Sequence, residues 1–377
     1  MLTGAGVRRV ETLPVVVRFG RLGDLVLQTP LLHLLHARFG EPCRLVTAGV
    51  WAEPLLSGHP DVASIWPLRR RHAPLPLSPE RWRLAAALRR CVGPIYVSEN
   101  SPRQLAKIGR LFRLAGIARD QCVFLEDLSS PPEHWVDRLL QLGRMTPRRF
   151  LPQVDSAAVA HIWRAPRLFL DAADRADRDA WLRRRGLTGR PIVLVQIGNK
   201  RAIRFGRPRQ GDSKAWPITH WVKLLRAIGN DLPDACIVLC GSAAETSLLE
   251  TVSSAAAHAR VLVATKDLPL RRLLALMETA HSMVSVDTGP AHMAAAIGCP
   301  LVVLYGAESS RVWGRRSPAG SPIVELGDAT EQDSVSQVSP DHAIEAWTDV
   351  ARAAGRSRPA LAAPVTHAWQ TRIRAAS

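Results

Sequence analysis

Two aspartates lie in matching settings near opposite ends of the chain, and both could take part in a group-transfer reaction. Asp24 follows the apolar run at 15–17 and a glycine turn, and Asp287 follows the apolar run at 283–286. Each run is typical of a strand that ends at the start of a helix, where unpaired backbone N–H groups attract phosphate. The pattern therefore predicts two facing α/β domains with a reaction between them.

Asp24 has two interpretations that the sequence leaves open. As an N-cap, its carboxylate would accept a backbone N–H group and stabilise the helix by about 1 kcal/mol. As a general base, it would take the proton of an acceptor hydroxyl while that oxygen displaces a leaving group. One carboxylate can also do both jobs.

The second helix start is a candidate site for a diphosphate. Thr288 and Gly289 could simply cap the helix and allow a tight turn. Alternatively, the N–H groups after Asp287 and the Thr288 hydroxyl could stabilise the negative charge that develops on a leaving diphosphate. His292, about one turn into the helix, is either a buried packing residue or a ligand of the same group.

Three other polar residues of the second half could belong to this site. Lys214 precedes Ala-Trp-Pro, and only five of the 50 basic residues are lysine. A loop lysine is ordinarily solvated, but beside a diphosphate it supplies the positive charge that a metal ion gives elsewhere. Glu245 is either a first-turn glutamate favoured by the helix dipole or a ligand contact. Asn199 is a candidate for a phosphate contact.

Composition limits the class of protein. With 377 residues, 47% of them hydrophobic, the chain is long enough for two domains with ordinary cores. No run reaches the ~20 apolar residues of a membrane helix, and the N-terminus lacks the apolar segment of a signal peptide, so we expect a cytoplasmic protein. The six cysteines are irregularly spaced without a C-x-x-C pair, which favours reduced thiols over zinc or disulfides.

The net charge of +17 predicts attraction to anions such as nucleic acid, acidic lipid or a phosphorylated glycolipid. GC-rich coding explains the excess of arginine equally well. A basic nucleic-acid-binding protein is the alternative from a different class, and it would need a basic groove, often with stacking aromatics. The eleven tryptophans are scattered, and we recognise no nucleic-acid module, so we expect no nucleic-acid partner.

Apolar runs and helical patterns alternate most regularly in the second half. Strands are expected at 192–197, 235–240, 260–264, 283–286 and 301–305, an alternation typical of a doubly wound parallel sheet. In the first half, a strand and helix over 13–39 precede a strand at 44–47, and 50–165 is less regular. We predict domains at 1–170 and 190–350, a charged linker at 171–189 and a tail at 351–377.

Three groups of motifs appear in a fixed order. They are Arg-Phe-Gly-Arg-Leu-Gly-Asp at 18–24 with Thr-Pro-Leu-Leu at 29–32, Lys-Ala-Trp-Pro at 214–217, and Val-Asp-Thr-Gly-Pro-Ala-His at 286–292 with Gly-Cys-Pro at 298–300. Together they resemble glycosyltransferase family 9, which contains the ADP-heptose:lipopolysaccharide heptosyltransferases. The chain departs from the family at 307–310, where Ala-Glu-Ser-Ser stands in place of the frequent Pro-Thr-Asp.

The resemblance implies an α/β protein of GT-B architecture, with two facing Rossmann-like domains, parallel sheets and a central cleft. It implies an inverting, metal-independent transfer of heptose or a related sugar from an ADP-sugar to a lipopolysaccharide core acceptor, with Asp24 as the base. The first domain would bind the acceptor, and the second would bind the nucleotide sugar. Donor contacts would be Asn199, Lys214, Glu245 (to the ribose), Asp287 (to diphosphate or sugar hydroxyls), Thr288, Gly289 and His292. Acceptor contacts would be Gly23, Arg69, Arg70, Arg71, Lys200, Arg201 and Arg204.

No cofactor is expected, because the ADP-sugar is a substrate, and no metal site is expected, because no cluster of metal ligands is visible in the sequence. The expected partners are that donor, an anionic glycolipid and, peripherally, the cytoplasmic face of the inner membrane; another nucleotide-sugar donor is the alternative within the family. Asp177-Arg178-Asp179 spells D-x-D, a metal–nucleotide signature of a different transferase fold. It lies in a charged run with i,i+4 pairing potential, so we expect a solvated helix face there.

Overall fold

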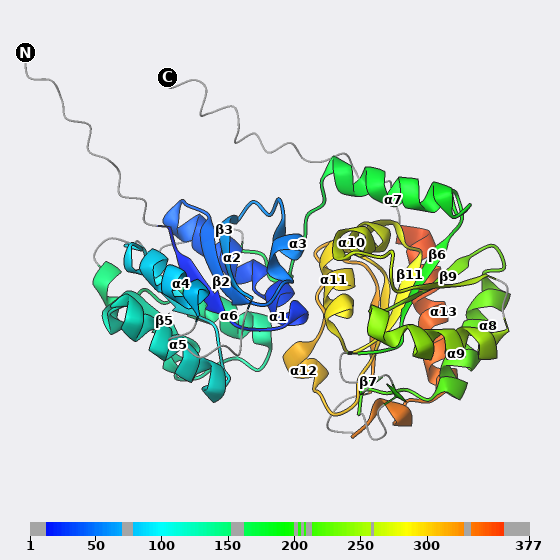
Figure 1. Cartoon of the computed structure of the whole chain (residues 1–377). Helices are drawn as coiled ribbons and strands as arrows, with labels where there is room; N and C mark the ends of the chain where they lie inside the picture. Colours follow the sequence, from blue (N-terminus) through cyan, green and yellow to red (C-terminus); the bar gives the residue numbers. More distant parts are fainter. Residues whose placement is uncertain are drawn as a thin grey trace, which may run out of the picture.

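The computed structural model describes residues 13–69, 78–151, 162–199, 203–204, 207–208, 213–257, 260–327 and 333–357. It contains two large parallel sheets, one in each half of the molecule (Figure 1). The first sheet has the order β3-β2-β1-β4-β5. Its strands are β1 (Val15–Arg18), β2 (Cys43–Ala48), β3 (Val62–Leu68), β4 (Ile95–Val97) and β5 (Cys122–Phe124).

Helices cover both faces of the first sheet, so successive residues of β1 enter different cores. Val15 and Val17 share a core with α4 (Pro79–Arg89) and α5 (Pro102–Ala115). Val16 belongs to the core on the opposite face, whose helices are α1 (Leu22–Leu27), α2 (Thr29–Phe39), α3 (Ala52–Leu56) and α6 (Trp135–Arg144).

The second sheet has the order β10-β9-β6-β11-β12-β13. Numbered within this half, that is 3-2-1-4-5-6, the order of a doubly wound dinucleotide-binding sheet. Its strands are β6 (Ile192–Gln196), β9 (Cys236–Cys240), β10 (Val261–Ala264), β11 (Ser282–Val286), β12 (Leu301–Leu304) and β13 (Ile323–Leu326). Strands β7 (Ile203–Arg204) and β8 (Arg207–Pro208) form a separate antiparallel pair.

Two helical layers also enclose the second sheet. On one face lie α8 (Ile218–Asp231), α9 (Thr246–Ala256) and α13 (Pro340–Ser357), and on the other lie α7 (Ala172–Arg184), α10 (Leu270–Thr279) and α11 (Gly289–Ile297). A short helix, α12 (Ser310–Trp313), follows β12. Within the described residues, no helix is long and apolar enough to cross a membrane.

The segment predicted to be a linker contains α7. Asp171 accepts the backbone N–H of Asp174 at 2.8 Å and caps this helix. The helix packs on α10 through ion pairs between Asp174 and Arg271 and between Asp177 and Arg272. The expected solvated helix face is therefore wrong for this side of α7. Helix α13 also continues to Ser357, so the predicted tail begins within a helix; the domain bounds themselves stay a prediction.

The two halves meet where α1 approaches α11 (Figure 1). A Cβ atom added to Gly23 would lie 2.8 Å from Cδ2 of His292, and one added to Gly289 would lie 2.9 Å from Cβ of Leu22. Glycine at both positions is what lets the backbones come this close. The helix starts after β1 and β11 therefore lie next to each other.

Candidate active site

Both predicted centres lie at topological switch points. The strand order reverses between β1 and β4 in the first sheet and between β6 and β11 in the second. Ligands of open α/β sheets bind in the crevice at the carboxyl ends of such strands. Asp24 follows β1, and Asp287 follows β11 directly, so each occupies the position where this fold binds ligands.

Asp24 is the third residue of α1 rather than its N-cap. Its Oδ2 accepts the backbone N–H of the N-cap residue, Arg21, at 2.7 Å. Its Oδ1 accepts a hydrogen bond from Nη2 of Arg18 at 2.6 Å. The side chain is 21% exposed, so the carboxylate is both held in place and open to a substrate.

Arg18 fixes the orientation of this carboxylate. It is buried at the end of β1, and its Nη1 donates to the carbonyl of Ser98 at 2.6 Å and lies 3.5 Å from Oε1 of Glu99. Its guanidinium lies over the ring of Trp135, 5.0 Å from the centroid. Because Ser98 and Glu99 follow β4, both strands of the first switch point help to position Asp24.

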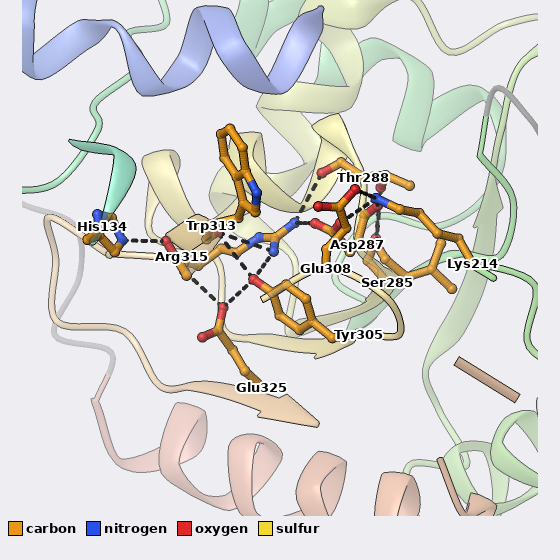
Figure 2. Close-up of polar contacts among 12 residues, drawn as sticks. His134, Lys214, Ser285, Asp287, Thr288, Tyr305, Glu308, Trp313, Arg315 and Glu325 are labelled. Carbon is orange, nitrogen blue, oxygen red and sulfur yellow. Dashed lines mark hydrogen bonds and ion pairs between the residues drawn. The ribbon is translucent and has the colours of Figure 1, made fainter. Parts of the chain in front are cut away.

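Asp287 is held between two cations (Figure 2). Nζ of Lys214 lies 2.5 Å from Oδ2, and Nη2 of Arg315 lies 2.5 Å from Oδ1. Burial alone would raise the pKa of Asp287, but the charges of Arg315 and Lys214 outweigh it and hold the pKa well below its ordinary value. Asp287 is therefore ionised throughout the physiological range.

The two cations differ in exposure. The Arg315 side chain is completely buried, whereas that of Lys214 is 20% exposed. Arg315 also donates to the Tyr305 hydroxyl, which donates in turn to Oε1 of Glu325 at 2.9 Å (Figure 2). Arg315 is thus a fixed part of the site, while Lys214 can contact a ligand.

The start of α11 offers backbone donors beside these charges. Thr288 is the N-cap residue, but its hydroxyl does not cap the helix; it donates to the Val286 carbonyl at 3.2 Å. Gly289 and Pro290 follow as the first helical residues. The open helix start and Lys214 together form a site suited to a phosphate group.

Glu245 has one occupied and one unoccupied carboxylate oxygen. Oε2 accepts the Ser242 backbone N–H at 2.8 Å and the Ser242 hydroxyl at 2.7 Å, as in a capping box. Oε1 is buried against Gly198 and has no hydrogen-bond partner among the described residues. A buried acceptor without a donor is costly, and a ligand hydroxyl at the end of β6 would satisfy it.

Residues of both halves connect the two centres. Trp135 of α6 packs against Trp313, with 5.0 Å between the ring centroids. Nε2 of the neighbouring His134 lies 3.1 Å from the Gly314 carbonyl oxygen (Figure 2). The contact between the halves therefore adjoins Arg18 on one side and Arg315 on the other.

The remaining predicted residues are placed as follows. His292 is buried against Gly23, and burial together with the charge of Arg315 lowers its pKa, so its imidazole is neutral. Asn199 follows β6, and Arg69 pairs with Glu53 at 2.8 Å on the surface. Arg70, Arg71, Lys200 and Arg201 lie outside the described residues, as does the side chain of Arg204 in β7. The ligand contacts of all these residues stay predictions.

Sequence reasoning assigned no role to Arg18, Trp135, Trp313 or Arg315. Arg18 stands in the first motif, at the end of a buried strand, where an arginine needs an acidic partner. The position of Arg18 at the end of a buried strand could therefore have identified it as a partner of an acidic residue. Arg315 carries no such signal, because it lies 28 positions from Asp287 in a loop.

The architecture and the charged residues at both switch points define a GT-B protein, as predicted. The family model for glycosyltransferase family 9 (heptosyltransferase) matches residues 166–343. Lipopolysaccharide heptosyltransferase 2 of Salmonella typhimurium is 26% identical over 310 residues, covering 76% of this chain and 81% of the relative.

Solved structures match nearly the whole chain. The Escherichia coli ADP-heptose lipopolysaccharide heptosyltransferase II aligns with a TM-score of 0.66 at 20% identity, covering 90% of this chain and 98% of that chain. A family 9 glycosyltransferase from Veillonella parvula aligns with a TM-score of 0.68 at 16% identity, covering 91% and 97%. The chain is therefore similar to glycosyltransferase family 9 through residues 166–343 and shares the fold of heptosyltransferase structures along nearly its whole length.

Proposed function

We propose that the protein transfers heptose, or a related sugar, from an ADP-sugar to a lipopolysaccharide core acceptor. The observation that carries this proposal is the pair of centres at facing switch points, a carboxylate in one half and a cation-bound helix start in the other. The similarity to lipopolysaccharide heptosyltransferases of Salmonella typhimurium and Haemophilus influenzae supports the choice of substrates.

The chemistry assigned to the first half is proton removal. Asp24 accepts the proton of the acceptor hydroxyl as that oxygen forms a bond to the anomeric carbon. The bond between this carbon and the diphosphate breaks, and its electron pair goes to the departing ADP. Attack from the face opposite the leaving group inverts the anomeric configuration. Arg18 keeps the carboxylate oriented without entering the reaction.

The chemistry assigned to the second half is stabilisation of the leaving group. Lys214 turns from Asp287 toward the diphosphate, and the N–H groups at the start of α11 share the developing charge. Asp287 stays ionised at that moment because Arg315 remains bound to it. Lys214 and these N–H groups supply the positive charge that a divalent metal ion supplies in other transferases, so the proposed reaction needs no metal. Glu245 accepts a hydroxyl of the ADP ribose through its free Oε1.

The proposed setting follows from the substrates. The acceptor is an anionic glycolipid, so the protein works in the cytoplasm at the inner face of the inner membrane and contacts it peripherally. Arg69, Arg70, Arg71, Lys200, Arg201 and Arg204 are proposed to meet the anionic groups of the acceptor, and Gly23 is proposed to line its site. No nucleic-acid partner is part of this proposal.

The deciding experiment is a transfer assay with the full chain. Purified protein is incubated with ADP-heptose and a core oligosaccharide acceptor, and the product is followed by mass spectrometry and by the anomeric proton coupling in NMR. We expect heptosylated acceptor of inverted configuration together with ADP. Turnover of a different nucleotide sugar in place of ADP-heptose would refute the choice of donor, and retained configuration would refute the role of Asp24.

A further inference from the structure

Two neighbouring helices of the first half present a surface rich in arginine. Helices α4 and α5 cover the same face of the first sheet, and α5 contains four basic residues and no acidic residue. Six arginines on or directly after these helices are exposed, and we call them the basic surface. They are Arg83, Arg89, Arg90, Arg103, Arg110 and Arg113.

The spacing of these arginines places them on the outer sides of the two helices. Residues seven apart lie on one helix face, as Arg103 and Arg110 do on α5 and as Arg83 does with Arg90, the C-cap residue of α4. The opposite faces are buried against the sheet, including Leu84, Leu88, Ile108 and Leu111. The arginines therefore lie on the solvent-exposed sides of the two helices, opposite the faces that pack on the sheet.

The charge of the basic surface is not neutralised by neighbouring acids. Among the residues that the structure describes, no carboxylate forms an ion pair with any of its six arginines, and Arg89 instead donates to the Leu114 carbonyl. The arginines between α7 and α10 are the contrast, because Arg175, Arg271 and Arg272 each pair with an acid. An unneutralised cluster on one face attracts an extended anionic partner.

Two large apolar side chains are exposed beside these arginines. Trp82, on α4, is 50% exposed, and Val92, shortly after α4, is 48% exposed. Tryptophan is favoured at the boundary between membrane and water, where its apolar ring meets the headgroup region. Arginines in the same surface would meet lipid phosphates. This combination fits a bilayer better than it fits a globular protein surface.

We propose that the basic surface docks the protein on an anionic lipid bilayer. The proposal rests on the proposed function, because a glycolipid acceptor is embedded in a membrane. Helices α4 and α5 lie in the half that carries Asp24, on the side away from α11 and the second sheet (Figure 1). Docking through them brings the acceptor half to the membrane and leaves the donor half in water.

The test is sedimentation of the full chain with vesicles. Vesicles contain phosphatidylcholine alone or with about 30% phosphatidylglycerol, at physiological ionic strength, where exposed charges act over about 8 Å. The variant carries Arg103→Glu, Arg110→Glu and Arg113→Glu. Its matched control carries Arg183→Glu, Arg184→Glu and Arg352→Glu, exposed positions of α7 and α13 with the same formal charge change.

We expect binding only to the anionic vesicles, with about a 100-fold loss in the α5 variant and little loss in the control. An independent pair on α4, Arg83→Glu with Arg90→Glu, should also lose binding. Equal losses in the α5 variant and the control would overturn the proposal, since net charge alone would then explain binding. Unchanged binding in both surface variants would also overturn it.

Two further measurements separate this proposal from its alternatives. A DNA duplex is titrated at the same salt; DNA binding that is tighter than vesicle binding and is lost in the α5 variant would make nucleic acid the partner and overturn the proposal. Transfer to detergent-dissolved acceptor should be unchanged in all variants, because none alters the candidate active site. Wild-type protein that binds vesicles but transfers no heptose would refute the proposed function alone.

Discussion

Replacing Asp24 with asparagine separates its two roles, and the structure sets the expected size of each effect. Both carboxylate oxygens accept hydrogen bonds, from Arg18 at 2.6 Å and from the backbone N–H of Arg21 at 2.7 Å. An amide has only one acceptor oxygen, so its NH2 group would face one of these donors. A lost hydrogen bond to a charged group costs about 1.5–3 kcal/mol when buried.

Asp24 is 21% exposed, so we place the loss in the free energy of unfolding at about 1–2 kcal/mol. For a domain of this size, that corresponds to a melting temperature lower by about 3–6 °C. The rate of sugar transfer should fall by ~10²–10⁴-fold, because the amide cannot accept the proton of the acceptor. ADP affinity should be unchanged, since the proposed donor contacts all lie in the other half.

The measurements are thermal melting, ADP titration calorimetry and initial transfer rates, and Arg18→Gln is the matched control. It removes the same ion pair but keeps the carboxylate, so its melting temperature should fall at least as far while its rate falls less than ~10-fold. Near-native transfer by folded Asp24→Asn protein would refute the assignment of the base. Equal rate losses in both variants would show that the ion pair, not proton transfer, is what the reaction needs.

Four further outcomes are expected. Lys214→Ala should weaken ADP binding by about 10-fold or more in calorimetry with the fold intact, and unchanged affinity would remove Lys214 from the site. Transfer should survive excess EDTA; activity abolished by the chelator and restored by magnesium or manganese would contradict the metal-free account. Arg315→Gln should raise the pKa of Asp287 and so move the acid limb of the pH–rate profile to higher pH, whereas Arg315→Lys should not. Burial lowers the pKa of His59 to about 4, below its ordinary 6.5, so protonation of this imidazole in the unfolded chain should contribute about 2 kcal/mol to the fall in the free energy of unfolding between pH 7 and pH 5. His59→Gln should reduce the pH dependence of the free energy of unfolding in urea by that amount, and an unchanged pH dependence would contradict the assignment.

Long buried strands could be predicted from the sequence, and short ones could not. All the strands expected between 192 and 305 are present within a residue or so at either end, because each is a continuous apolar run between turns. In the first half, β4 and β5 have three residues each, and β3 contains Pro67, so no apolar run marked them. Helix α6 was also missed, although Val136, Leu139, Leu140 and Gly143 of its buried face follow the helical period.

In the candidate site, too, residues that belong to a contiguous pattern could be predicted, and their distant partners could not. Asp24 and Asp287 were found because a strand, a glycine turn and an aspartate are contiguous in the chain. The residues that hold them are not contiguous: Ser98 binds Arg18 across 80 positions, and Lys214 reaches Asp287 across 73. Such pairs depend on strand order, which a single sequence does not fix. The D-x-D segment was expected to lie on a solvated helix face, but Asp177 pairs with Arg272 of α10 and so takes part in the packing of α7.

The two centres are also joined by contacts that cross between the halves. Arg18 binds Asp24 and lies over Trp135, Trp135 packs on Trp313, and Arg315, two residues further, binds Asp287. Separation of the halves would break the contact between Trp135 and Trp313, but it would leave Arg18 on Asp24 and Arg315 on Asp287, because each ion pair lies within one half. The interface therefore sets how the two centres face each other, while the orientation of Asp24 and the charge state of Asp287 are fixed within each half. Transfer between two substrates held on different domains requires a fixed distance between the two centres, and the contacts of Trp135 with Trp313 and of His134 with Gly314 supply it.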